Sequence, residues 1–262
     1  RLNWRGMFGM PDAAHDSTVA IIPARSGSKS VPDKNIADLA GHPVLAYSIA
    51  VARLSQEIDR VLVSTDINDY ADLAREYGAE APFLRPAEVA SDTAGDLEVL
   101  RHVMDWMSDH EHHVPEYWVY LRPSTPLRDS VLVDQAIRQF KDAGEAVSLR
   151  SAHPAPESPR KWFRKLGNNF FPLMDGVTMA ETDQPKEAFA TAFVPDGYVD
   201  VFKASQVRGR GALHGDRIMA FVSPVNTEID SAEELDYLRH QLECNGSPLL
   251  EFLNKRERGE TP

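Results

Sequence analysis

The segment TVAIIPARSGSKSVPDKN, residues 18–35, decides the fold of this 262-residue chain. It begins with a short apolar run rich in β-branched residues, 19–24, and this pattern predicts a buried strand. The run continues into a loop of small residues that contains three cations, Arg25, Lys29 and Lys34. Small residues let backbone N–H groups approach phosphate oxygens, and cations neutralise the phosphate charge. We therefore interpret the loop as a polyphosphate-binding loop, with a solvated surface loop as the alternative. Its spacing is neither GxxxxGK nor GxGxxG.

Outward from this segment, strand patterns alternate with helix patterns. Further strands are predicted at 60–65, 117–121, 146–150 and 217–224. Amphipathic helix patterns lie between them, and a Ser-x-x-Glu capping box at Ser231 begins the closing helix. This alternation predicts an α/β fold with an open, mainly parallel sheet covered by helices. In such sheets ligands bind at the carboxyl ends of the strands, which is where the polar loops of this sequence fall.

We expect four parts along the chain. Residues 1–16 are expected to form a disordered or non-native tail, and 17–150 a nucleotide-binding α/β core. Residues 151–195 are rich in Pro, Lys, Arg and aromatic side chains. This composition breaks the alternation and indicates an inserted arm for acceptor binding or dimerisation. Residues 196–262 then complete the core with a pair of carboxylates and a C-terminal helix.

The composition is acidic, with 40 Asp and Glu against 28 Lys and Arg and a formal net charge of −12. Such a surface repels nucleic acid and anionic membranes, so neither is an expected partner. No apolar run approaches the length of a membrane span. Because Cys244 is the one cysteine, no internal disulfide can form, which fits a reducing compartment. We expect a cytoplasmic protein that binds small molecules.

A pair of carboxylates, Glu228-x-Asp230, follows the last predicted strand and precedes the capped helix. In an extended segment, residues two apart point to the same side of the chain. Two carboxylates in that position suit Mg²⁺, which prefers oxygen ligands and bridges to phosphates. The alternative is that these acids favour the helix entry through the helix dipole.

Two further polar loops follow predicted strands. The first, RPAEVASDTA at 85–94, is interpreted as a ligand loop or as an ordinary loop with a helix cap. In the second, Arg122 and Arg128 flank the sequence Pro-Ser-Thr-Pro. Two arginines there suit bidentate binding of a carboxylate or phosphate, and surface ion pairs are the alternative.

Taken together and in their order, these motifs resemble those of the CMP-sialic acid synthetases, or acylneuraminate cytidylyltransferases. The matching stretches are AIIPARSGSK with PDKN, VLVSTD, FLRPAEVASDTA, YLRPSTPLR and TEIDSAEELD, and they cover about residues 19–243. The resemblance implies a Rossmann-like nucleotidyltransferase fold with a small dimerisation arm. It also implies a homodimer that transfers CMP from CTP to an acidic sugar, releases pyrophosphate and depends on Mg²⁺ or Mn²⁺.

The resemblance further implies roles for individual residues. The expected nucleotide-binding residues are Ala24, Arg25, Ser28, Lys29, Lys34, Asn35, Arg85, Ser91, Asp92, Thr93 and Ala94. The expected catalytic residues are Arg25, Lys34 and Asp230. Glu228 and Asp230 match the paired metal ligands, although relatives usually have Asp at the first position. The expected acceptor-binding residues are Arg122, Ser124, Arg128, Lys161 and Lys186, the two lysines reaching a neighbouring subunit's site.

The departures from the family pattern concentrate on the acceptor side. Arg122 stands where relatives usually have Gln, Lys186 and Val194 where they have Arg, and Asp196 where they have Asn. The nucleotide half therefore looks intact, and the expected acceptor is a nonulosonic acid such as a sialic acid. One alternative is a small phosphonate or other acidic acceptor, which an added arginine would suit. The other is a non-catalytic nucleotide-binding module.

Overall fold

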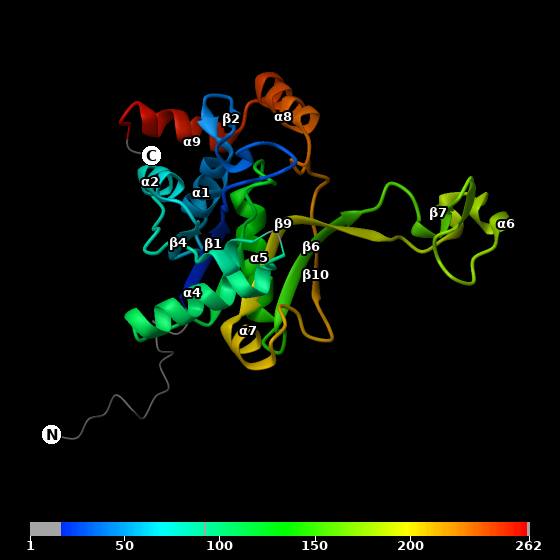
Figure 1. The fold of residues 1–262 in the computed structure, drawn as a ribbon, viewed down its shortest axis with the longest axis horizontal. Coiled ribbons are helices and arrows are strands. Elements are labelled where there is room, and N and C mark those ends of the chain that lie inside the picture. Colours follow the sequence, from blue (N-terminus) through cyan, green and yellow to red (C-terminus); the bar gives the residue numbers. More distant parts are fainter. Residues whose placement is uncertain (1–16, 92, 261–262) are drawn as a thin grey trace.

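A six-stranded sheet forms the centre of the molecule (Figure 1). The computed structural model describes residues 17–91 and 93–260. The strand order is β10-β6-β9-β5-β1-β4. In chain order the strands are β1 (Thr18–Pro23), β4 (Arg60–Ser64), β5 (Tyr117–Tyr120), β6 (Ser148–Pro154), β9 (Phe193–Lys203) and β10 (Met219–Val222). Every pairing is parallel except those of β9, which runs antiparallel to β5 and β6. The predicted mainly parallel sheet is confirmed.

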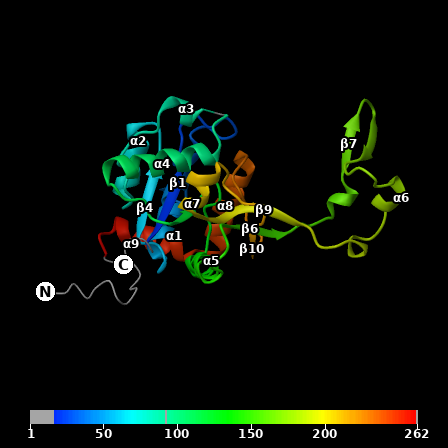
Figure 2. The same ribbon diagram turned by 90° about the horizontal axis from the view of Figure 1, so that it is seen from below.

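Helices cover both faces of this sheet (Figure 2). One face carries α1 (Val44–Leu54), α5 (Ser130–Asp142), α8 (Ala232–Asn245) and α9 (Pro248–Glu257). The other face carries α4 (Asp96–His110) and α7 (Ala204–Arg210). Two short helices, α2 (Asn68–Glu76) and α3 (Ala87–Ala90), follow β4. Among the described residues, no helix is both long enough and apolar enough to cross a membrane.

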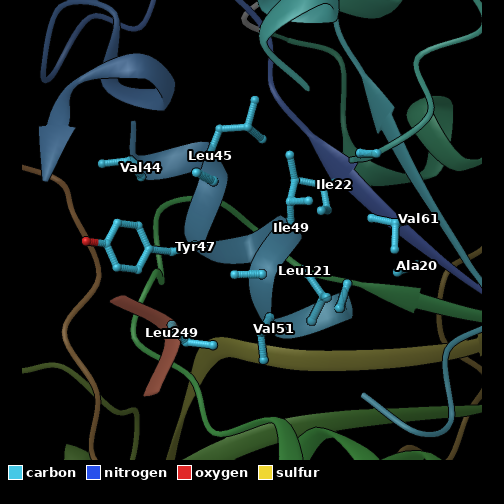
Figure 3. Close-up of a cluster of buried hydrophobic side chains, with 14 of the residues drawn as sticks. Ala20, Ile22, Val44, Leu45, Tyr47, Ile49, Val51, Val61, Leu121 and Leu249 are labelled. Carbon is cyan, nitrogen blue, oxygen red and sulfur yellow. The ribbon is translucent and has the colours of Figure 1, made fainter. Parts of the chain in front are cut away.

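The opening strand is buried on both sides, because its alternate residues enter two different cores. Ala20 and Ile22 belong to the larger core under α1, while Val19 and Ile21 belong to the core under α4. Figure 3 shows Ala20 and Ile22 facing the side chains of α1. A central strand buried on both faces needs a continuous apolar run rather than alternation, and this explains the composition of β1.

Two of the longer elements, β9 and α9, were not predicted from the sequence. In β9, Pro195, Gly197 and Asp200 interrupt the apolar pattern, and Asp200 is nevertheless only 1% exposed. In α9, the hydroxyl of Ser247 accepts a hydrogen bond from the backbone N–H of Leu249, so the helix starts from a side-chain cap. Both elements are therefore defined by tertiary contacts or a local cap, while their hydrophobic pattern is weak.

The inserted segment forms an arm that projects from the carboxyl edge of the sheet (Figures 1 and 2). Because β6 and β9 extend to Pro154 and Phe193, the arm itself comprises 155–192, inside the predicted 151–195. It contains a hairpin of β7 (Phe163–Leu166) and β8 (Asn169–Pro172), followed by the short helix α6 (Met179–Thr182). The tail predicted at 1–16 lies outside the described residues.

Candidate nucleotidyl-transfer site

The loop after β1 is held by an aspartate at the end of the neighbouring strand β4. The Asp66 carboxylate accepts hydrogen bonds from the backbone N–H of Ser26 at 2.7 Å and from its hydroxyl at 2.6 Å. The N–H of Ala24 donates to the carbonyl of Ser64 at 2.9 Å, which extends the β1–β4 pairing by one residue. Asp66 is not among the predicted site residues, although an acid directly after a parallel strand is a usable signal.

The same loop is closed at its far end by two further contacts. The side-chain amide of Asn35 donates to the carbonyl of Arg25 at 2.8 Å. Asp33 adopts a left-handed conformation with φ 48°, and its carboxylate accepts a hydrogen bond from the Tyr70 hydroxyl at 3.0 Å. The loop from Arg25 to Asn35 is thus folded back on itself, with the side chain of Lys29 exposed. The loop therefore holds its cations on a constrained backbone, an arrangement that favours anion binding.

Arg85 lies beside this loop but is tethered to β4. Its Nε donates to the hydroxyl of Ser64 at 3.0 Å and its Nη2 donates to the Ser64 carbonyl at 2.5 Å. The residue is 5% exposed, and burial lowers the pKa of its guanidinium. A guanidinium stays protonated in proteins, so the consequence is a fixed positive charge in a poorly solvated position.

Within the predicted stretch 91–94, the described residues Ser91, Thr93 and Ala94 belong to a turn that leads into α4. The N–H of Ala94 donates to the carbonyl of Ser91 at 3.2 Å, and the hydroxyls of Ser91 and Thr93 lie 3.2 Å apart. Asp92 lies outside the described residues. The turn presents small side chains and hydroxyls, which suits close approach by a ligand without deciding what that ligand is.

The segment 228–230 after β10, which contains the carboxylate pair, is hydrogen-bonded to the loops after β1 and β5. The N–H of Ile229 donates to the carbonyl of Ser124 at 2.7 Å, and the Ser124 hydroxyl donates to Oε1 of Glu228 at 2.8 Å. The Lys34 ammonium donates to the Ile229 carbonyl at 2.6 Å and lies 3.2 Å from Oδ1 of Asp230. Ile229 is fully buried, so the carboxylates on either side of it are directed away from the core. Segments nearly 200 residues apart meet here.

These two carboxylates fit a magnesium ion that is shared with a substrate. Mg²⁺ usually takes one or two protein carboxylates and completes its shell with water and substrate phosphates. No cluster of three or more His, Cys, Asp or Glu side chains suited to a metal occurs in the described part of the chain. An all-protein metal centre is therefore not built here, whereas Glu228 and Asp230 with a bound polyphosphate supply the donors that Mg²⁺ prefers.

Arg122 is held in a partly buried cluster of charged residues that was not predicted from the sequence. Its Nη1 donates to Asp200 at 2.8 Å and its Nη2 donates to Asp96 at 2.5 Å. Asp200 also accepts from Nε of Arg150 at 3.1 Å. Burial opposes the charge of Arg122, but the two aspartates outweigh it and raise its pKa above the usual value. One available signal was Asp200 itself, an acid inside the apolar sequence Val-Asp-Val-Phe.

The guanidinium of Arg128 is bound by the protein itself. Its guanidinium donates to the carbonyls of Tyr198, Gly197 and Arg122 and to the hydroxyl of Ser48, at 2.6 to 3.0 Å. The side chain is almost fully buried, and burial lowers the pKa of the guanidinium. Four protein acceptors leave little of its hydrogen-bonding capacity for a ligand. Arg128 is therefore not among the proposed acceptor-binding residues.

The two predicted arm lysines lie together at the root of the arm. Lys161 Nζ lies 3.1 Å from Oε2 of Glu157, and Lys186 Nζ lies 3.5 Å from the carbonyl oxygen of Pro156. Neither lysine has a hydrogen bond or ion pair to the loops after β1, β4 and β5 within residues 17–91 and 93–260. The role predicted for them in acceptor binding remains a prediction.

Asp196 anchors the root of the arm. Its carboxylate accepts hydrogen bonds from the hydroxyls of Ser151 and Ser223, the N–H of Tyr198 and Nδ1 of His153. Burial alone would raise the pKa of Asp196, but these hydrogen bonds outweigh it and the pKa is lowered. The charged form is therefore the one that the fold stabilises.

Comparison with known proteins identifies the family of the chain. A cytidylyltransferase family model matches residues 19–193. The N-acylneuraminate cytidylyltransferase of Escherichia coli is 38% identical over 123 residues, which are 47% of this chain and 28% of that protein. The CMP-N,N'-diacetyllegionaminic acid synthase of Legionella pneumophila is 34% identical over 150 residues, 56% of this chain and 62% of the relative. The match therefore spans less than two thirds of the length of either relative.

Solved structures extend the likeness to the fold. A CMP:2-keto-3-deoxy-manno-octonic acid synthetase solved with CTP aligns with a TM-score of 0.65 and 16% identity, over 87% of this chain and 99% of that one. A cytidylyltransferase from Leptospira borgpetersenii aligns with a TM-score of 0.56 and 14% identity, over 93% and 96%. The predicted α/β nucleotidyltransferase fold is confirmed.

Proposed function

Because this chain belongs to the cytidylyltransferase family, we propose that it transfers CMP from CTP to a hydroxyl of a nonulosonic acid and releases pyrophosphate. The relatives named for acylneuraminate and N,N'-diacetyllegionaminic acid support this acceptor class. The pseudaminic acid cytidylyltransferase of Campylobacter jejuni, which is 34% identical to this chain over 122 residues, supports the same acceptor class.

One structural observation carries the proposal. The cationic loop after β1 and the carboxylate pair after β10 are joined by the Lys34–Asp230 contact, and the loop after β5 joins them through Ser124 and Glu228. All three loops follow the carboxyl ends of strands in one sheet, the usual ligand position in such folds. Cations for a triphosphate and oxygens for a metal are therefore available within one site.

In the proposed reaction the acceptor hydroxyl oxygen attacks the α-phosphorus of CTP. The bond from that phosphorus to the bridging oxygen breaks, pyrophosphate leaves and the hydroxyl proton is released. Arg25, Lys29 and Lys34 would stabilise the charge on the transferred and leaving phosphates. Most of the acceleration would come from positioning and electrostatics, and no covalent enzyme intermediate is needed.

A divalent cation, Mg²⁺ or Mn²⁺, would be held by Glu228 and Asp230. When bound, it would neutralise phosphate charge and polarise the reacting phosphoryl group. Glu228 is oriented for this role by the Ser124 hydroxyl, and a glutamate carboxylate offers the same donor atoms as an aspartate. Arg85 and the residues of the 91–94 stretch would contact the rest of the nucleotide.

We also propose that the arm mediates a homodimer. Phe163, Leu166, Phe170 and Phe171 on the β7–β8 hairpin are all more than two fifths exposed. The Phe163 and Phe170 rings lie 5.8 Å apart, so the apolar side chains gather on one hairpin. Patches of this kind mark interfaces between proteins. A cytoplasmic location, where CTP is available, completes the proposal.

A pyrophosphate-release assay tests the function. The purified chain is incubated with Mg²⁺, each of the four nucleoside triphosphates in turn, and N-acetylneuraminic, pseudaminic or N,N'-diacetyllegionaminic acid. We expect release with CTP and at least one of these acids, with no release when the acid is omitted. Equal turnover of ATP, GTP or UTP, or no turnover of CTP with any acid, contradicts the proposal.

A further inference from the structure

A small cavity of about 170 Å³ opens beside the carboxylate pair. It is lined by Arg122, Arg150, Pro195, Gly197, Asp200 and Glu228. Glu228 connects it to the proposed metal position, so a ligand in the cavity lies next to the reacting phosphate. Every other charged lining residue belongs to the cluster around Asp200. The net charge on this side of the cavity therefore depends on how Arg122 and Arg150 are paired with aspartates.

Strand register places Asp200 between the two arginines. On β9, Asp200 is the direct cross-strand partner of Tyr120 on β5 and of Arg150 on β6. Its Oδ1 accepts from Nε of Arg150 at 3.1 Å, while its Oδ2 accepts from Nη2 of Arg150 at 3.3 Å and from Nη1 of Arg122 at 2.8 Å. Because Asp200 is only 1% exposed and is paired on both sides within the sheet, its position is fixed by the sheet.

A second aspartate completes the neutralisation of Arg122. Asp96, at the start of α4, accepts from Nη2 of Arg122 at 2.5 Å and from the Tyr120 hydroxyl at 2.8 Å. The guanidinium carbon of Arg122 also lies 4.9 Å from the centre of the Tyr120 ring. Two arginines thus face two aspartates. Arg122 therefore adds no surplus positive charge to this cluster.

Both arginines line the cavity, and each retains N–H donors because a guanidinium has five. Arg150 uses Nε and Nη2 for Asp200, and its Nη1 has no hydrogen bond to the described residues. The side chains of Arg122 and Arg150 are 21% and 29% exposed, so each is partly open to solvent. Guanidinium edges fixed in this way match the planar, two-oxygen geometry of a carboxylate.

We propose that Arg122 and Arg150 form a subsite for one carboxylate of the acceptor, and that Asp200 is the positioning residue that aims both. The two aspartates balance the two arginines, so the subsite prefers a monoanionic carboxylate to a dianionic phosphonate. The selectivity is the difference between the affinities for the carboxylate and for the phosphonate. The subsite has no excess positive charge with which to stabilise the second negative charge of the phosphonate. The inference rests on the proposed function and adds its acceptor specificity.

The test is calorimetry with matched ligands in the presence of saturating CMP, which occupies the nucleotide side without turnover. The ligands are N-acetylneuraminic acid and its analogue with phosphonate in place of carboxylate, at a pH where the phosphonate is a dianion. We expect the wild-type chain to prefer the carboxylate. Arg150→Gln should weaken carboxylate binding about 10- to 100-fold, and Arg150→Lys should weaken it less, because a lysine is a single point charge.

Asp200→Asn should lower the preference for carboxylate over phosphonate about tenfold. Because Asp200 is buried and this variant can fail to fold, Asp96→Asn serves as a second test that removes a negative charge from the same cluster at a more exposed position. Arg138→Gln, an exposed change on α5 where Arg138 pairs with Glu57, is the control for loss of one cation. The ratio of the two affinities is informative because a merely structural defect would weaken both ligands together.

Three outcomes overturn the subsite: neither ligand binds to the wild type, the phosphonate binds better, or Arg150→Gln behaves like Arg138→Gln. An unchanged ratio in both Asp200→Asn and Asp96→Asn overturns the positioning role. The proposed function fails separately, in the pyrophosphate assay, because the calorimetric measurement involves no turnover. Release of pyrophosphate with unaltered binding in Arg150→Gln would leave the function standing and remove only the subsite.

Discussion

The ammonium of Lys34 lies 3.2 Å from Oδ1 of Asp230 and 2.6 Å from the carbonyl oxygen of Ile229. A cation of the loop after β1 is therefore paired with a carboxylate proposed to hold the metal. Without nucleotide, Lys34 and a metal ion would compete for Asp230. A bound triphosphate would offer Lys34 another partner, which would favour metal and nucleotide binding together.

This relationship predicts opposite effects of Lys34→Met on metal binding and on catalysis. Asp230 is 68% exposed, and an exposed ion pair contributes about 0.2–1 kcal/mol. Loss of the pair should therefore strengthen Mn²⁺ binding in the absence of nucleotide by about one and a half- to fivefold, measured by paramagnetic resonance. Pyrophosphate release should fall about 100-fold or more. Lys255→Met on α9 is the control, and weaker Mn²⁺ binding in Lys34→Met would refute the competition.

Asp230→Asn tests the metal ligand with minimal change in shape. The amide is a poorer ligand for a hard cation and lacks the charge, so we expect about a 100-fold loss of metal-dependent pyrophosphate release. Asp236→Asn removes the same charge from an exposed position on α8, where Asp236 pairs with Arg239, and should keep full activity. Thermal unfolding should be similar for both variants. Wild-type activity in Asp230→Asn would exclude this carboxylate from the metal site.

Asp66→Asn tests the support of the phosphate loop. The two hydrogen bonds from Ser26 reach a carboxylate, and bonds to charged groups contribute about 1.5–3 kcal/mol. We expect the KM for CTP to rise about tenfold or more, because the loop loses its fixed backbone. Asp69→Asn, an exposed change in the first turn of α2, is the control. An unchanged KM for CTP in Asp66→Asn would show that the loop is held by other contacts.

The Asp196 carboxylate predicts a pH dependence of stability. Hydrogen bonds lower its folded-state pKa, so its contribution is fully present above the unfolded-state value, about 3.9. The contribution is lost as the pH falls through the lower folded-state pKa. Asp196→Asn should destabilise the fold by about 1–3 kcal/mol at neutral pH. Urea unfolding should also show a shallower loss of stability below pH 4 than in the wild type, and parallel acid limbs would contradict this role.

The arm hairpin predicts the oligomeric state. Phe170 is 62% exposed on β8, and a charge there should oppose burial against a second copy. Light scattering after gel filtration should show a dimer for the wild type and a monomer for Phe170→Glu. Val131→Glu, at a similarly exposed position on α5, should remain dimeric. A wild-type monomer at micromolar concentration, or a dimer in Phe170→Glu, would rule out this interface.

Local patterns were sufficient for much of the fold. The apolar run of β1 predicted a strand because a strand buried on both faces requires one, and Ser231 predicted the start of α8 because its hydroxyl caps that helix through the N–H of Glu234. The strand β9 was not predicted, because it is stabilised by pairing with β5 and β6 rather than by a clear apolar pattern. The charged residue Asp200 interrupts that pattern in the sequence.

The sequence by itself determined the central strand, the cationic loop and the spacing of Glu228 and Asp230, because each depends on neighbours within a few residues. Only the tertiary structure decided which charges meet. The order β6-β9-β5 places Asp200 between Arg150 and Arg122, and the common carboxyl edge places Lys34 against Asp230. Coulomb interactions depend on distance in space, and strand order sets that distance independently of separation along the chain.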